Sequence, residues 1–175
     1  IQLYLKTPRL RGLLALCWAS SATGAMVFVN TVQLVKSDLM LGDSAVALVL
    51  GSFGAGSMLA ALALPRILRS SEDRSVMFAG AGISVLALLG FGLTALLQPP
   101  SFVSVTAFWC AIGFGFSATL TPSGRVLSRS AHSADRPALF AAHFTLSHAC
   151  WLIAYPVAGF TGSLFGLAAA AIILS

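Results

Sequence analysis

Residues 45–97 read AVALVLGSFGAGSMLAALALPRILRSSEDRSVMFAGAGISVLALLGFGLTALL. This stretch holds two long apolar runs, 45–68 and 76–97, and a short charged connection between them. At about 1.5 Å per residue, a helix formed by either run crosses a hydrocarbon layer of about 30 Å. The connection carries arginine at its start and at its end. The pattern predicts a hairpin of two transmembrane helices whose turn is basic.

Three further runs have the same character, and they cover residues 12–34, 102–122 and 137–160. A sixth run, 164–175, is too short to span a bilayer, so we expect it to be the opening of a truncated sixth helix. The sequence predicts an all-α membrane protein with a single transmembrane domain over residues 1–175. We expect the chain to be a fragment of a longer protein.

Basic residues alternate between the connections. Nine of the ten precede the first run or follow the second and fourth runs: Lys6, Arg9, Arg11, Arg66, Arg69, Arg74, Arg125, Arg129 and Arg136. Cytoplasmic loops are enriched in Lys and Arg, whereas only Lys36 lies on the other side. The amino terminus and the loops 69–75 and 123–136 are therefore predicted to be cytoplasmic in a multi-pass protein of the inner (cytoplasmic) membrane.

The composition excludes a soluble protein. Apolar residues make up 58% of the chain and charged residues only 9%, against about a quarter in soluble domains. The net charge of +5 comes from small clusters beside the apolar runs, without an aromatic-interleaved basic surface. We therefore expect a lipid bilayer as the partner and no nucleic acid.

Polar residues inside the first run form one stripe. Ser20, Thr23 and Asn30 lie within roughly 80° on a helical wheel, and polar groups in lipid must face protein or water. Two interpretations of Asn30 remain open: a side chain that faces substrate or a gate, and an interhelical hydrogen bond.

The fifth run places His148, Trp151 and Tyr155 on one face, at i, i+3 and i+7. His148 either lines a cavity near the bilayer midplane or is a buried neutral imidazole bonded to a neighbouring helix. Trp109, in the fourth run, is either a cavity residue or an interfacial aromatic anchor. His143 lies closer to the cytoplasmic end.

The apolar runs contain no Asp or Glu. A transporter driven by protons or cations usually keeps a carboxylate in the membrane, so this chain is predicted to bind or gate rather than to couple. Three separated cysteines give no metal or disulfide framework, and no hydrolase or zinc-protease motif occurs. We expect no enzymatic activity, no cofactor and no metal.

Five arginines near the cytoplasmic ends are candidates for an inner gate: Arg66, Arg69, Arg74, Arg125 and Arg129. Arg125 and Arg129 share one face of any short helix that follows the fourth run. These charges either remain solvated and orient the protein, or pair with acidic groups and latch the gate.

The layout resembles the carboxyl-terminal half of a major facilitator superfamily transporter, closest to the drug-efflux branches. The resemblance rests on the basic start YLKTPRLR (residues 4–11), the glycine-rich second run ending in LPRILR (64–69), and the tight hairpin of the third and fourth runs. Gly56 would match the opening glycine of the family's loop motif. The Asp of that motif is missing, because Leu64 and Pro65 occupy its region.

The resemblance implies a twelve-helix protein whose amino-terminal six-helix half is missing here, with a central cavity and alternating access. It makes Asn30, Trp109 and His148 cavity candidates, beside Ser20 and Thr23. We predict a secondary active transporter that exports a small amphipathic molecule. A channel or pore subunit and a non-transporting membrane scaffold remain as alternatives.

Overall fold

The computed structural model describes residues 1–130 and 132–175, and every regular element in them is helical. The elements are α1 (Gln2–Lys6), α2 (Pro8–Gln33), η1 (Leu34–Asp38), α3 (Asp43–Ser70), α4 (Asp73–Leu97), α5 (Phe102–Leu120), α6 (Ser123–Arg129), η2 (Ser133–Asp135), α7 (Arg136–Phe165) and α8 (Leu167–Leu174). Five segments, based on α2, α3, α4, α5 and α7, are long and apolar enough to cross a membrane. The expected all-helical, multi-pass architecture is confirmed at this level.

Four of the long helices, α2, α3, α4 and α7, extend beyond the apolar runs that predicted them at one or both ends, whereas α5 ends at Leu120, inside its run. The predicted loop 69–75 shrinks to residues 71–72, and the loop 123–136 contains α6 and η2. The outer connection expected at 161–163 is wrong, because α7 continues to Phe165 and the chain turns at Gly166, whose φ is 82°. Hydropathy marks where lipid ends, whereas a helix ends where its backbone hydrogen bonds end, so charged residues can continue a helix into water.

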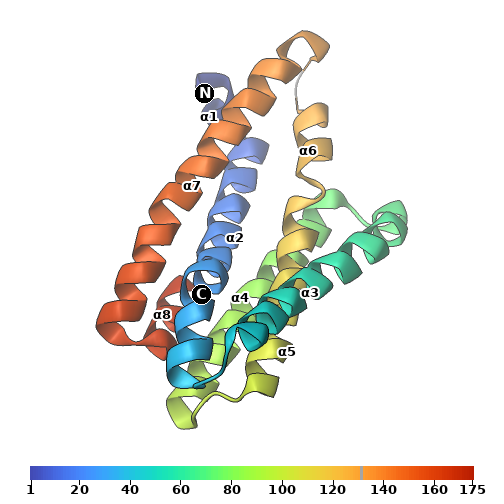
Figure 1. Ribbon diagram of the computed structural model, residues 1–175. Helices are drawn as coiled ribbons and strands as arrows, with labels where there is room; N and C mark the ends of the chain where they lie inside the picture. Colours follow the sequence, from blue (N-terminus) through green and yellow to red (C-terminus); the bar gives the residue numbers. More distant parts are fainter. Residues whose placement is uncertain (131) are drawn as a thin grey trace.

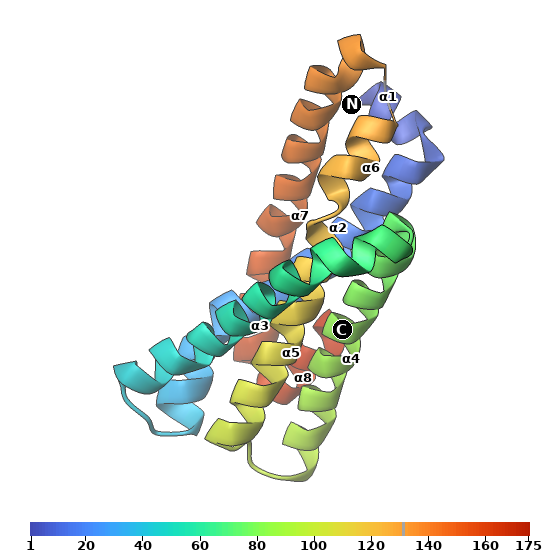
Figure 2. The same ribbon diagram turned by 90° about the vertical axis from the view of Figure 1, so that its right-hand side faces the viewer.

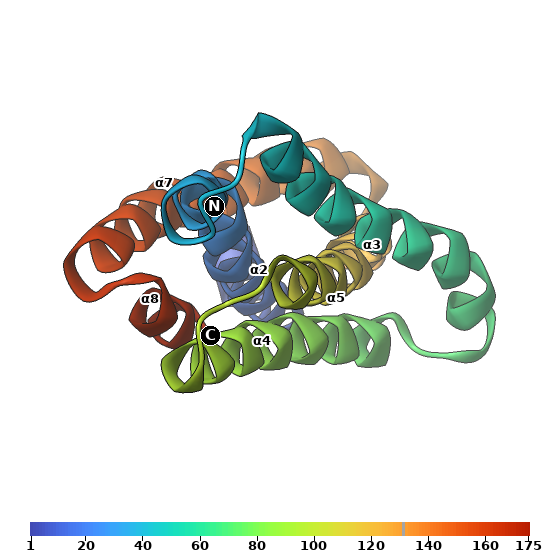
Figure 3. The same ribbon diagram turned by 60° about the horizontal axis from the view of Figure 1, so that its bottom comes forward.

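Helices α2 and α5 occupy the centre of the bundle (Figures 1 and 3). Helix α7 packs against α2, and α3 packs against α5. Figure 3 shows α4 along one side of this central pair and α3 and α7 along the opposite side. Helix α8 lies against α4 and α7. Residues of α3 and α7 are the least buried of the five long segments, and these two helices do not pack closely against each other. We call the side of the bundle on which both lie, opposite α4, its open face.

Glycines let α5 approach its neighbours closely. A Cβ added at Gly56 of α3 would clash with the backbone of Cys110, and one at Gly113 of α5 would clash with the backbone of Phe53. The contact between α4 and α5 is similar, and there Ser84 Oγ donates to the Ile112 carbonyl at 3.2 Å. Close backbone approach through small residues is the usual way in which membrane helices pack.

The connections alternate between the two ends of the bundle. The chain start, α6 and the beginning of α7 lie together at the top of Figure 1, and the α3–α4 connection lies on the same side of the bundle's middle (Figures 1 and 2). The basic residues that flank these elements therefore share one end, which we call the basic end.

Candidate functional site

Four aromatic side chains from four helices form a closed ring of contacts. Phe28 of α2 lies 5.3 Å from Phe53 of α3, and Phe53 lies 5.5 Å from Phe116 of α5, measured between ring centroids. Trp151 of α7 closes the ring at 6.1 Å from Phe116 and 6.0 Å from Phe28. We call these four residues the aromatic cluster. Such separations and tilted planes are typical of favourable aromatic pairs.

The spacing of α7 brings further aromatic rings to the cluster. Phe144, His148, Trp151 and Tyr155 follow one another at intervals of four, three and four residues, so they form one stripe along the helix. The Tyr155 ring lies 5.1 Å from Trp151, and the Phe144 ring lies 3.9 Å from His148. Trp151 is the sixteenth of the 30 residues of α7, so the cluster is centred near the middle of that helix.

The cluster is only partly covered by the chain. Phe53 is 8% exposed and forms its buried floor, whereas Phe28 is 46% and Tyr155 is 41% exposed. His148 and Phe144 are also exposed. The open face between α3 and α7 thus presents aromatic rings at mid-helix depth, where lipid-facing surfaces more commonly carry aliphatic side chains.

His148 adds a polar group to this face. Its Nδ1–H donates to the Phe144 carbonyl at 2.8 Å, because a carbonyl can only accept. In the neutral ring the other nitrogen, Nε2, then carries a lone pair and acts as an acceptor. The alternative of a buried imidazole bonded to a neighbouring helix is wrong, since His148 is exposed and bonds to its own helix.

The other predicted cavity residues lie within helix contacts. Asn30 is 2% exposed, and its Nδ2 donates to the Ala158 carbonyl of α7 at 3.1 Å, so it is an interhelical contact here. Trp109 is fully buried, and its indole N–H donates to Thr31 Oγ1 at 2.7 Å. The interfacial-anchor interpretation of Trp109 is therefore wrong.

The polar stripe of α2 turns toward protein rather than toward the open face. Ser20 is 3% exposed, and Thr23 is fully buried. The Thr23 hydroxyl is shared between the carbonyls of Ala19 and Ser20, at 3.1 and 3.2 Å. Of the predicted cavity residues, only His148 thus lies on the aromatic stripe of α7, where its ring contacts Phe144.

Two of the predicted gate arginines pair with an acidic group that the sequence did not single out. The Asp73 side chain, at the start of α4, is 6% exposed; its Oδ2 accepts from Arg129 Nη1 at 2.8 Å and its Oδ1 lies 3.3 Å from Arg125 Nε. Arg66 and Arg69 are exposed and make no ion pair among the described residues. The acidic partner of these two arginines is thus Asp73, at the start of α4.

A second polar contact ties α1 to α7 at the basic end. The Tyr4 hydroxyl lies 2.9 Å from His143 Nδ1, and Tyr4 is fully buried. Burial raises the pKa of the Tyr4 hydroxyl well above its ordinary value, so the phenol stays protonated and shares a hydrogen bond with the imidazole nitrogen.

Comparisons of the chain with protein-family models, with curated proteins and with solved structures found no match. What the protein does must therefore be inferred from the placement of its own side chains. The sequence pointed to His148, Trp151 and Tyr155 but missed Phe28, Phe53 and Phe116. Phenylalanine occurs 12 times in the chain, and no spacing within one helix reveals which rings meet across four helices.

Proposed function

We propose that this chain is the carboxyl-terminal half of a secondary active transporter of the major facilitator type, and that it carries a small amphipathic molecule by alternating access. The observation that supports the proposal most is the partly exposed aromatic cluster at mid-helix depth. It joins side chains of α2, α3, α5 and α7, which are the first, second, fourth and fifth of the long helices. In the family that the sequence resembles, helices at these positions of each half line the cavity.

The cluster suits a substrate with an apolar, planar body. Aromatic faces contribute dispersion, stacking and, for a cationic substrate, attraction to the ring quadrupole. The Nε2 of His148, within one helical turn of Trp151, would accept a hydrogen bond from a donor group on the same molecule. No Asp or Glu lies in the long apolar runs, so recognition of a positive charge would depend on the rings.

The placement of the rings also suits alternating access. Because each ring belongs to a different helix, rocking of α3 and α7 relative to the central α2–α5 pair would separate or close the contacts Phe28–Phe53 and Phe116–Trp151. Binding and movement would then act on the same side chains, as expected for a site near the midplane between repeats.

Transport is tested with the natural protein reconstituted in proteoliposomes under an imposed pH gradient, with ethidium as the planar aromatic probe. We expect Trp151→Ala to lower gradient-driven flux by about tenfold, because the ring that contacts both Phe28 and Phe116 is removed from the cluster. The matched control is Trp18→Ala, since Trp18 is a 43% exposed tryptophan of α2 outside the cluster. It should keep flux within about twofold of the parent, a change well under 1.4 kcal/mol.

Equal flux in the Trp151 and Trp18 variants would contradict the assignment of the site, and flux that does not depend on the pH gradient would contradict coupled transport.

Two further variants, Asn30→Ala and His148→Ala, distinguish a transporter from a non-transporting membrane scaffold. Under the proposal, loss of the buried Asn30 contact lowers stability, whereas loss of the exposed His148 lowers flux at unchanged stability. A scaffold would show effects on folding and no flux with any probe.

A further inference from the structure

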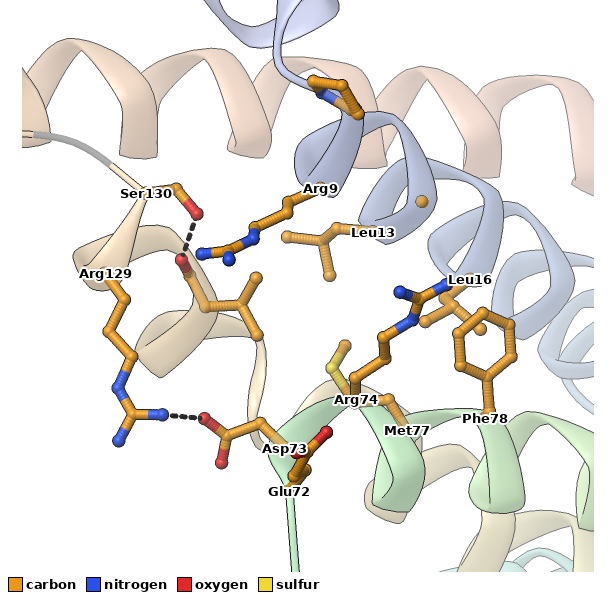
Figure 4. A pocket seen from close by; sticks show the side chains of 13 residues that line it. Arg9, Leu13, Leu16, Glu72, Asp73, Arg74, Met77, Phe78, Arg129 and Ser130 are labelled. Carbon is orange, nitrogen blue, oxygen red and sulfur yellow. Dashed lines mark hydrogen bonds and ion pairs between the residues drawn. The ribbon is translucent and has the colours of Figure 1, made fainter.

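A pocket of about 630 Å³ opens at the basic end, far from the aromatic cluster. It lies between the first turns of α2, the start of α4 and α6 (Figure 4). Its volume falls within the range of about 300 to 1,000 Å³ that is usual for sites of small ligands. The proposed transport function does not use it.

Arginines line the outer part of the pocket. Figure 4 shows Arg9 reaching from α2 into the space beside α6, and Arg74 reaching from α4 toward α2. Neither residue has an acidic partner among the described residues. The guanidinium of Arg74 lies 5.4 Å from the centroid of the Phe78 ring, which directs it along the pocket wall. Arginine forks match the oxygens of phosphate groups.

Acidic residues also border the pocket, but the basic residues outnumber them. Arg125 and Arg129 together face the single carboxylate of Asp73. Arg9 and Arg74 line the pocket together with the exposed Glu72. Three basic side chains (Arg9, Arg74 and Arg129) and two acidic ones (Glu72 and Asp73) line the pocket, which leaves a net positive charge and favours an anion. Arg125 lies outside the lining but also pairs with Asp73.

The inner part of the pocket is apolar, and the order is the same on both helices. On α2, Leu16 follows Arg9 by seven residues, about 10 Å along the axis, and on α4, Met77 and Phe78 follow Arg74. Phe78 lies within the apolar run 76–97 and is 50% exposed. Both helices start at the basic end, so charge lies outermost and apolar surface lies toward the membrane interior.

We propose that this pocket binds an anionic phospholipid, with its phosphate on Arg9 and Arg74 and the start of an acyl chain along Leu16, Met77 and Phe78. A phospholipid at the membrane surface presents the same order of groups, and basic pockets between transmembrane helices are known to take such headgroups. The lipid would hold α2 against α4 and α6 at this end. Because the phosphate chemistry is shared with soluble phosphate esters, the test compares both sources.

The full-length protein, purified in neutral detergent, is titrated with dioleoyl phosphatidylglycerol, dioleoyl phosphatidylcholine and glycerol 3-phosphate, and bound molecules are counted by native mass spectrometry. We expect the anionic lipid to bind best and the soluble ester to bind only weakly. The variant Arg9→Gln/Arg74→Gln should bind the anionic lipid about 30-fold more weakly, as two surface arginines are lost. Raised salt should weaken binding in the same direction.

The matched control is Arg66→Gln/Arg69→Gln, which removes two charges at the same end of the bundle but outside the pocket. It should change the affinity for the anionic lipid by less than about threefold, as is usual for exposed surface charges. Arg9→Lys/Arg74→Lys keeps the charge but not the guanidinium fork, and it should bind more tightly than the double glutamine variant and more weakly than the parent, so a general folding defect is separated from loss of the site. Equal binding of the two lipids, or equal effects of the two double glutamine variants, would overturn the proposal. Glycerol 3-phosphate binding as tightly as the lipid would overturn the lipid as the source of the phosphate.

Discussion

Gly24 of α2 is the single residue on which the aromatic cluster depends most directly. A Cβ at this position would lie 2.5 Å from Cη2 of Trp151 and 3.3 Å from Cε2 of Phe116. The indole of α7 therefore occupies the space that any larger residue at position 24 would need. Glycine here serves close approach rather than an unusual backbone angle.

We predict that Gly24→Ala displaces the end of the Trp151 indole and costs about 1 to 3 kcal/mol of stability, the usual range for overpacking. Ethidium binding should fall together with stability. The control Gly82→Ala adds the same methyl group to α4, where no atom lies within 4 Å. It should be neutral or stabilise by up to about 1 kcal/mol through helix propensity. Unfolding in sodium dodecyl sulfate and probe fluorescence measure both effects; identical behaviour of the two variants would contradict the packing described here.

Single residues were predicted with uneven success, for a physical reason. A helical wheel places residues of one helix on a common face, so the spacing in the sequence is enough to group His148, Trp151 and Tyr155. The wheel does not tell which face meets another helix. Asn30 and Trp109 therefore looked like cavity residues, although both lie in helix contacts.

At the scale of elements, Asp73 connects α4 with α6. Its carboxylate is 6% exposed, whereas the side chains of Arg125 and Arg129 are 44% and 65% exposed. Oδ1 has no hydrogen bond among the described residues, although Arg125 Nε lies 3.3 Å away. The carboxylate is thus the one member of the trio that depends on its partners for solvation.

This asymmetry predicts an unequal effect of removing either side of the contact. Arg125→Gln/Arg129→Gln leaves a buried charge alone and should cost about 2 kcal/mol or more, less than a fully buried pair because the arginines are half exposed. Asp73→Asn leaves two arginines that water can solvate, and it should cost about 1 kcal/mol, near the upper end for exposed pairs. Unfolding in sodium dodecyl sulfate gives both values. The reverse order would show that Asp73 stabilises through packing rather than through its charge. Each single arginine variant should cost less than the double one, since the remaining guanidinium still faces the carboxylate.

The elements themselves were largely predictable, but their ends were not. Five apolar runs gave five long helices because lipid requires the backbone to satisfy its own hydrogen bonds. Helix α6 lies in a polar segment, and Thr161 and Ser163 lie inside α7 just before its end at Phe165. At such positions hydropathy no longer distinguishes a helix from a loop. Pro65 and Pro156 also lie inside α3 and α7, which shows that proline does not by itself end a membrane helix.

At the scale of the whole molecule, nine basic and three acidic residues gather at the basic end, for a net charge of +6. The rule of positive cytoplasmic loops predicts that this end lies inside the cell. The connections of the bundle alternate between its two ends, as this topology requires.

We predict that cysteine labelling will show which end of the bundle faces the cytoplasm. In a background with Cys17, Cys110 and Cys150 replaced by alanine, Ser71→Cys lies in the α3–α4 connection and Gln98→Cys in the α4–α5 connection; both positions are exposed. A membrane-impermeant maleimide should modify position 98 in right-side-out vesicles and position 71 only in inside-out vesicles. The opposite pattern would reverse the topology, and labelling of both positions from one side would contradict α4 as a spanning helix.

The two ends of the bundle carry net charges of opposite sign. Lys36 Nζ lies 2.6 Å from Asp43 Oδ1, and with Asp38 nearby the end opposite the basic end has a net charge of −1. The whole chain is thus an electric dipole aligned with its helices. Moving one elementary charge through a membrane potential of 100 mV changes its energy by about 2.3 kcal/mol. A potential that is negative at the basic end therefore opposes inversion of the molecule, and the voltage of an energised membrane would keep it in place.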